Sequence, residues 1–167
     1  MSWIDQVGAA FEYNEWANNK VLDATGKLTS EQLTGEPGGS RGSLADNLMH
    51  LVTTEMGWAA MISGTDLVPL QPAPNRGIAE TLRELFGRSH ARLREITAGL
   101  TAESLAEVVR MERGSETHGY PRWQLLLHLA NHGTQHRAEI GVALLALDAS
   151  PGDLDALDFF PDLGAEG

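Results

Sequence analysis

Three histidines recur at intervals of four residues in the last third of the chain: His128, His132 and His136. In an α-helix, side chains four residues apart lie next to each other on one face. Two imidazoles spaced in this way can bind one metal ion, as in helical metalloproteases, where a glutamate follows the first histidine. Here Gly133 follows His132, so the spacing is compatible with a metal site but not with that protease motif.

The apolar residues around these histidines indicate how such a helix would be buried. At about 100° per residue, His132 and His136 fall in the middle of an apolar arc roughly 80° wide. The arc consists of Leu125, Leu129, Ile140, Ala143 and Leu147. His128 falls to one side of it, where we expect a position beside the site or partly exposed, and Arg137 points elsewhere. Buried imidazole nitrogens need partners, which either a shared metal ion or hydrogen bonds to protein and water would supply.

A third metal ligand has to come from another helix, and His50 is the best candidate. It lies midway along the segment LADNLMHLVTTEMGWAAMISG, at the edge of an apolar arc. That arc consists of Leu44, Leu48, Leu51, Trp58 and Ile62. This position permits a ligand without requiring one. Trp58 follows His50 by eight residues, so it is a candidate for a wall of the same pocket.

Glu55 falls near the centre of the arc that contains Trp58, where an unpaired carboxylate would be costly. It could hydrogen-bond a metal-ligating histidine, accept a proton in catalysis, or pair with Arg137 in a purely structural role, and we favour the structural role. The remaining histidines are less informative. His90 has an arginine two residues to either side and is expected at the surface, and His118 is expected in a loop without a specific role.

Four segments have the length and periodicity of helices and are separated by loops rich in glycine and proline. They span about residues 3–25, 43–64, 78–100 and 121–147. Ser43 is a predicted helix cap, and Pro121 suits a first helical turn. Residues 29–33 could add a short helical turn, and residues 101–120 a small β-hairpin. The chain is therefore predicted to be all-α, one domain over residues 1–167, folded as an antiparallel four-helix bundle with a small hairpin before the last helix.

Composition narrows the classes of partner and of metal ligand. Lys and Arg total 12 against 23 Asp and Glu, and the resulting net charge of -11 disfavours nucleic acid and membrane as partners. Because there is no cysteine, a metal site must use histidine and carboxylate ligands. The N-terminus lacks the features of a signal peptide, and no apolar run reaches the roughly 18 residues that span a bilayer, so we expect a cytoplasmic protein. Four apolar side chains of the acidic tail could dock on the helices: Leu154, Leu157, Phe159 and Phe160.

Four segments resemble the DinB/YfiT-like family of metalloenzymes: YNEWANNKVL, GSLADNLMHLVTTEMGW, LLLHLANHGTQHRAEIGVAL and SPGDLDALDFF. The resemblance covers nearly the whole chain. It implies a four-helix bundle, often a homodimer, that binds a divalent metal ion such as Zn, Ni, Fe or Mn through His50, His132 and His136. Ala138 stands where a glycine is common in the family, which is a minor departure.

The resemblance also implies a chemistry. Characterised relatives include transferases and isomerases that use a low-molecular-weight thiol, so the leading hypothesis is a metal-dependent transferase or hydrolase acting on a small molecule, with such a thiol as co-substrate. Three protein ligands would leave a coordination position open for water or substrate. One alternative is a non-enzymatic bundle that binds metal or a small ligand for sensing, storage or a stress response. A third hypothesis is a helical dimerisation module whose histidines are merely buried. Substrate specificity is expected to lie in the loops at residues 64–77 and 111–120.

Overall fold

The computed structural model describes residues 2–36, 40–67 and 76–161. Parts of the predicted domain of residues 1–167, and residues 68–75 of the predicted specificity loop, lie outside these ranges. Four long helices dominate the structure: α1 (Trp3–Thr25), α3 (Leu44–Ser63), α4 (Ile78–Ala98) and α6 (Arg122–Ala146). Each end lies within two residues of the position predicted from periodicity and loop residues. The prediction of a mostly helical fold is confirmed.

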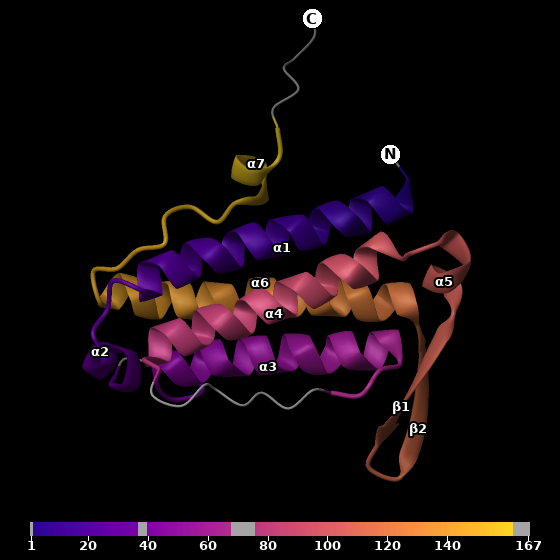
Figure 1. The fold of residues 1–167 in the computed structure, drawn as a ribbon, viewed down its shortest axis with the longest axis horizontal. Helices are drawn as coiled ribbons and strands as arrows, with labels where there is room; N and C mark the ends of the chain where they lie inside the picture. Colours follow the sequence, from indigo (N-terminus) through magenta and orange to yellow (C-terminus); the bar gives the residue numbers. More distant parts are fainter. Residues whose placement is uncertain (1, 37–39, 68–75, 162–167) are drawn as a thin grey trace, which may run out of the picture.

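Shorter elements lie between the long helices and after the last of them. They are α2 (Ser30–Thr34), α5 (Ala102–Ala106), β1 (Val108–Arg113), β2 (Glu116–Pro121) and α7 (Ala156–Phe159). The two strands form an antiparallel ribbon in which Val108 lies opposite Pro121, so the predicted hairpin is confirmed. Gly114, with a φ of +64°, stands in the turn between the strands. The ribbon projects from one end of the molecule (Figure 1).

Each long helix packs against two others: α1 and α3 both contact α4 and α6. Helices α1 and α6 run in one direction, and α3 and α4 run in the other (Figure 1). Two of the neighbouring pairs are therefore antiparallel and two are parallel, whereas sequence analysis predicted an antiparallel arrangement throughout. The length of the α3–α4 connection permits the parallel pair. Residues 64–77 can span about 45 Å when extended, which exceeds the roughly 30 Å length of a 20-residue helix.

The interior is divided into two apolar clusters by a layer of polar side chains. One cluster includes Leu48 and Phe86, and the other includes Phe11 and Leu129. Between them along every long helix lies what we call the polar layer: Asn14, Asn18, Glu55, Ser89, His90 and Arg137, all buried. Polar groups buried between apolar clusters are costly unless they are hydrogen-bonded.

Local interactions define the ends of α3, which carries His50. The backbone N–H of Asp46 donates to Ser43 Oγ at 3.2 Å, and the backbone N–H of Ser43 donates to Asp46 Oδ2 at 2.9 Å. This reciprocal pair satisfies donors that the first helical turn leaves free, and it confirms Ser43 as the cap. Gly64 ends the helix with a φ of +65°, a left-handed conformation that glycine adopts without strain.

The C-terminal tail returns along α1. The hydroxyl of Tyr13 donates to the carbonyl of Leu154 at 2.8 Å, and the ring of Phe159 lies 5.7 Å from that of Trp16. Docking is therefore confirmed for this part of the tail, but it is wrong for Leu157, which is 81% exposed. Among the described residues, no helix combines the length and the apolar character needed to cross a bilayer.

Candidate metal centre

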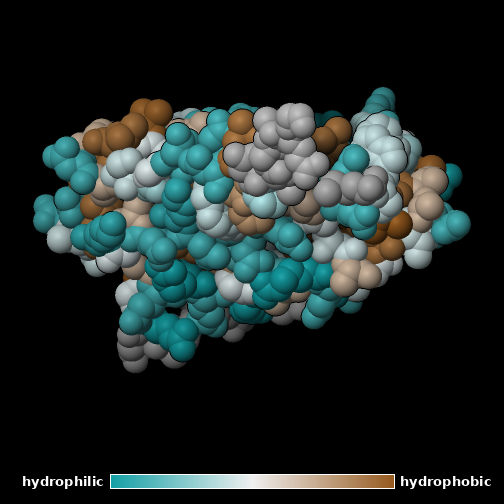
Figure 2. Space-filling model, turned by 90° about the horizontal axis from the view of Figure 1, so that it is seen from above, coloured by the Kyte–Doolittle hydropathy of each residue, from teal (hydrophilic) through white to brown (hydrophobic). Residues whose placement is uncertain are grey.

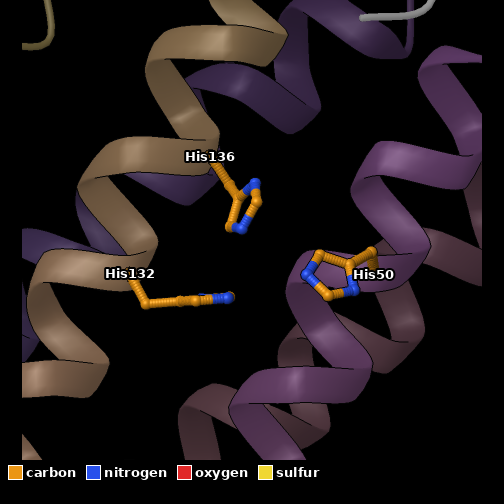
Figure 3. Close-up of side chains that lie close together, drawn as sticks. All are labelled: His50, His132 and His136. Atoms are coloured by element: carbon orange, nitrogen blue, oxygen red, sulfur yellow. The ribbon is translucent and has the colours of Figure 1, made fainter. Parts of the chain in front are cut away.

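His50, His132 and His136 lie together between two adjacent long helices. His50 comes from α3, and the other two come from successive turns of α6, with the three rings turned toward one another (Figure 3). One potential ligand atom from each ring lies within 4.8 Å of the others. The ring centroids of His132 and His136 are 4.3 Å apart, and that of His50 is 4.8 Å from His136. The structure thus brings together the three residues singled out in the sequence.

The separation of the ring nitrogens fits a metal ion after small side-chain rotations. A tetrahedral ion with bonds of about 2.1 Å holds its ligand nitrogens roughly 3.4 Å apart, so a 4.8 Å separation must close by about 1.4 Å. Within the part of the chain that the structure describes, two of the ring nitrogens, His50 Nε2 and His132 Nδ1, are buried without a hydrogen bond. Buried nitrogens of this kind are costly, and a bound cation would give them a partner.

Hydrogen bonds hold two of the rings in place. Thr54 Oγ1 lies 3.4 Å from His50 Nδ1, and Glu139 Oε2 lies 3.2 Å from His136 Nδ1. Glu139 Oε2 also accepts a hydrogen bond of 2.7 Å from Ser40 Oγ, and this bond lowers the pKa of the carboxyl, which keeps it ionised. Because an ionised carboxylate only accepts, His136 carries its proton on Nδ1 and presents the lone pair of Nε2 to the cluster.

His50 and His132 are neutral at physiological pH, the form of imidazole that binds metal ions. Burial, with smaller contributions from the neighbouring histidines, lowers the pKa of His132 to about 4. Burial is also the main cause of a lowered pKa at His50, and the charge of Arg41 adds to it. At pH 7, protons therefore compete only weakly with a metal ion for the ring nitrogens of His50 and His132.

Aromatic rings continue from the three histidines along α6. His128 lies 6.1 Å from His132 between ring centroids and 4.8 Å from Trp58 on α3. His128 is exposed and does not belong to the cluster of potential ligands. The structure therefore places Trp58 and His128 together at one side of the three histidines.

Comparison with known proteins agrees with this geometry. A family model described as the DinB family matches residues 4–161. The chain belongs to the DinB family. It is 27% identical over 144 residues to Protein DinB of Bacillus subtilis (strain 168), which covers 80% of this chain and 81% of that protein. The crystal structure of a conserved protein from Enterococcus faecalis shares the fold, with a TM-score of 0.65 and 11% identity, over 86% of this chain and 96% of that one.

In this DinB-family protein, Glu55 and Arg137 do not form the direct pair that we favoured from the sequence. Glu55 Oε1 accepts hydrogen bonds from Asn14 Nδ2 at 2.6 Å and from Asn18 Nδ2 at 3.2 Å. Arg137 Nη1 donates to Asn18 Oδ1 at 3.1 Å and also to Asn14 Oδ1. The two charges are thus joined through the amides of α1. Among the described residues, no hydrogen bond of Glu55 reaches one of the three clustered histidines.

The expectation of a surface position for His90 is wrong, because the residue is only 4% exposed. Its Nε2 lies 3.2 Å from Asn18 Nδ2, and its Nδ1 lies 3.9 Å from a carboxylate oxygen of Glu15. A sequence signal was present, since His90 follows the buried Phe86 by four residues and precedes the buried Leu93 by three. That helical spacing outweighs the flanking arginines as an indicator of burial.

Proposed function

We propose that this protein binds a divalent metal ion through His50, His132 and His136, within a bundle of four long helices. The observation that carries the proposal is the cluster itself: three imidazoles from two helices have potential ligand atoms within 4.8 Å of one another. Among the described residues, two of the ring nitrogens are buried without a hydrogen bond, and a bound cation would give them a partner. Zn, Ni, Fe and Mn all suit imidazole ligands, and supply would decide among them.

We further propose that the protein is a metal-dependent transferase or hydrolase acting on a small molecule, with a low-molecular-weight thiol as co-substrate. A divalent ion held by three protein ligands supplies Lewis acidity at an open position, where it lowers the pKa of bound water or of a thiol. The chain's own residues would orient the ligands, since Glu139 fixes the proton of His136 and Thr54 contacts His50. The rings of Trp58 and His128 would flank a substrate on the α3–α6 side.

Metal analysis of the protein, purified without a histidine tag, tests the site. We expect the wild type to retain a divalent metal ion, and His132→Ala to weaken its affinity by more than about 100-fold, because even partners of ligands contribute 10–100-fold. His118→Ala, on the ribbon and outside the cluster, is the matched control and should bind normally. A His132→Ala protein with wild-type metal content would overturn the assignment.

Turnover separates an enzyme from a protein that only binds the metal. The metal-loaded protein would be incubated with several thiols, each paired with a small electrophile or a hydrolysable ester. The proposed activity should disappear on chelation and return when the metal is restored. Metal binding without turnover of any thiol pair would favour the sensing or storage alternative.

We also propose that the protein forms a homodimer. Apolar side chains line a groove of about 720 Å³ that runs between α1, α5 and α6 near the base of the ribbon. Trp3, Trp123 and Leu127 are exposed there, with Trp3 exposed to 71%. Exposed apolar surface of this kind is typical of contact sites, and a second copy of the chain would cover it.

A further inference from the structure

The polar layer is one hydrogen-bonded network that joins all four long helices. Asn14 and Asn18 come from α1, Glu55 from α3, Ser89 and His90 from α4, and Arg137 from α6. Glu55 is fully buried and Arg137 is 2% exposed, so the layer buries one negative and one positive charge. Ser89 Oγ donates to Glu55 Oε2 at 2.8 Å, which brings α4 into the network.

The hydrogen bonds determine the orientation of both asparagine amides. In Asn14 and Asn18, the carbonyl oxygen faces Arg137 and the amide nitrogen faces Glu55. The second amide hydrogen of Asn18 points to His90 Nε2, which must therefore accept, and this leaves the His90 proton on Nδ1. Each amide oxygen therefore accepts from Arg137, and each amide nitrogen donates to Glu55.

We propose that the polar layer sets the axial position of α6 relative to α3, and so positions His132 and His136 against His50. This inference rests on the proposed metal site. Arg137 Nη1 bonds both Asn14 and Asn18, which are one turn apart on α1, and Glu55 of α3 bonds the same two amides. The two helices that carry the histidines, α3 and α6, are therefore hydrogen-bonded to the same two side chains of α1.

Small axial shifts are large compared with the tolerance of a hydrogen bond. Sliding one helix by a single residue moves it about 1.5 Å, which breaks hydrogen bonds that tolerate only a few tenths of an ångström. The ligand atoms of the cluster, within 4.8 Å of one another, already need to close by about 1.4 Å around an ion. Apolar contacts define the axial position less sharply, because side chains such as leucine repack when a neighbour shifts. The directional hydrogen bonds of the polar layer therefore define the axial position of the helices more sharply than the apolar contacts do.

Gly133 shows how closely the polar layer approaches the metal centre. It stands on α6 between His132 and His136, and a Cβ placed there would overlap Asn14 Oδ1 and come within 2.9 Å of Arg137 Nη1. Glycine is less favourable than alanine in a helix interior. The close approach of Asn14 and Arg137 gives the physical reason for a glycine at this position.

A pair of glycine substitutions in α6 tests the inference. Gly133→Ala would push the polar layer apart without removing a polar group or a ligand, whereas a Cβ at Gly141 meets no atom within 4 Å. Binding of Co²⁺ would be followed by its visible absorption spectrum, and the stability of each metal-free protein by urea unfolding in chelator. We expect Gly133→Ala to bind Co²⁺ at least about tenfold more weakly with an altered spectrum, and Gly141→Ala to bind as the wild type does.

A second variant, Arg137→Lys, keeps the charge but replaces the planar fork of donors with a single ammonium. It should fold and bind Co²⁺ about tenfold more weakly, because the lysine could not replace the bonds from Arg137 Nη1 to both amides of α1, and α6 would be positioned less sharply. Wild-type affinity and spectrum in both folded variants would overturn the inference while leaving the proposed metal site intact. Loss of folding in both would show that the polar layer is needed for the fold itself, which overturns a separate positioning role. A wild-type protein that binds no Co²⁺ would overturn the proposed function, and this inference with it.

Discussion

A histidine binds a metal ion only through a ring nitrogen without a proton, so protons and metal ions compete for His50, His132 and His136. Burial favours the metal ion over the proton, because it lowers the pKa of His132 to about 4 and lowers that of His50 as well. His136 is fixed in a different way, since Glu139 holds the proton on Nδ1. Metal binding should therefore persist to lower pH than it would with exposed histidines.

The same pKa values make the stability of the metal-free protein depend on pH. Imidazoles of the unfolded chain titrate near about 6.5, whereas the folded pKa of His132 is about 4, and burial also lowers that of His90. Between these values the unfolded chain binds more protons, so the free energy of unfolding should fall as the pH falls from about 6.5 to about 4. Urea unfolding in chelator at several pH values measures this slope.

A matched substitution isolates the contribution of His132 to that slope. His132→Gln should flatten the dependence on pH, and His118→Gln, on the ribbon, should leave it unchanged. Carboxylates whose pKa is lowered by hydrogen bonds, such as Asp46 bonded to Ser43, lose their contribution only at lower pH. An equal slope in the wild type and in His132→Gln would show that other groups cause the effect.

Among the elements, α6 serves three purposes on three faces. His132 and His136 face α3, while Gly133 and Arg137 face α1, and Leu127 lies on the exposed side with other apolar residues. The faces are separated because successive residues turn by about 100°. Helix α7 has a simpler role, since it seats the tail on the aromatic residues of α1.

Removing the aromatic contact of the tail should destabilise the protein measurably. Phe159→Ala deletes a ring that lies 6.1 Å from Tyr13 and 5.7 Å from Trp16, so we expect the free energy of unfolding to fall. Two aromatic pairs of about 0.5–1.5 kcal/mol each suggest a loss of about 1–3 kcal/mol. Leu157→Ala, two residues earlier and exposed, is the control and should change little. Equal effects of the two substitutions in urea unfolding would contradict the docking of Phe159.

For the whole molecule, surface charge and apolar patches act in opposite directions. The net charge of -11 makes copies of the chain repel one another. Hydrophilic residues cover most of the face seen in Figure 2, with hydrophobic patches toward both ends. The groove between α1, α5 and α6 concentrates apolar residues at one end of the molecule, beside the ribbon. Association through this groove would bury them while keeping most of the acidic surface in water.

Placing a charge in the groove should therefore prevent dimer formation. Leu127→Glu adds a carboxylate to the apolar lining, so we expect sedimentation to show a monomer where the wild type shows a dimer. Leu157→Glu adds the same charge at an exposed site outside the groove and should leave the dimer intact. Because salt screens the repulsion between the copies, wild-type association should strengthen as ionic strength rises. A dimer that persists in Leu127→Glu would exclude the groove as the interface.

Local patterns in the sequence determined the helices and two of the three histidines of the candidate site. Periodicity and caps depend on neighbouring residues, so the ends of α3, including Ser43, were predicted closely. The four-residue spacing of His132 and His136 is also a local property, so the helix face that they share could be derived from the sequence. For the same reason, the burial of Glu55 within its helix face was predicted correctly.

The tertiary structure decided everything that depends on how one helix lies against another. A helical wheel gives the angle of a residue about its own axis, but neither its neighbouring helix nor its height along that neighbour. The wheel therefore permitted His50 as a ligand, and only the packing of α3 on α6 brings its ring to 4.8 Å from His136. The burial of His90 and the amide-bridged contact of Arg137 likewise depend on partners in other helices. Side-chain periodicity is a property of one helix, whereas a site shared by several helices exists only once their directions and heights are fixed.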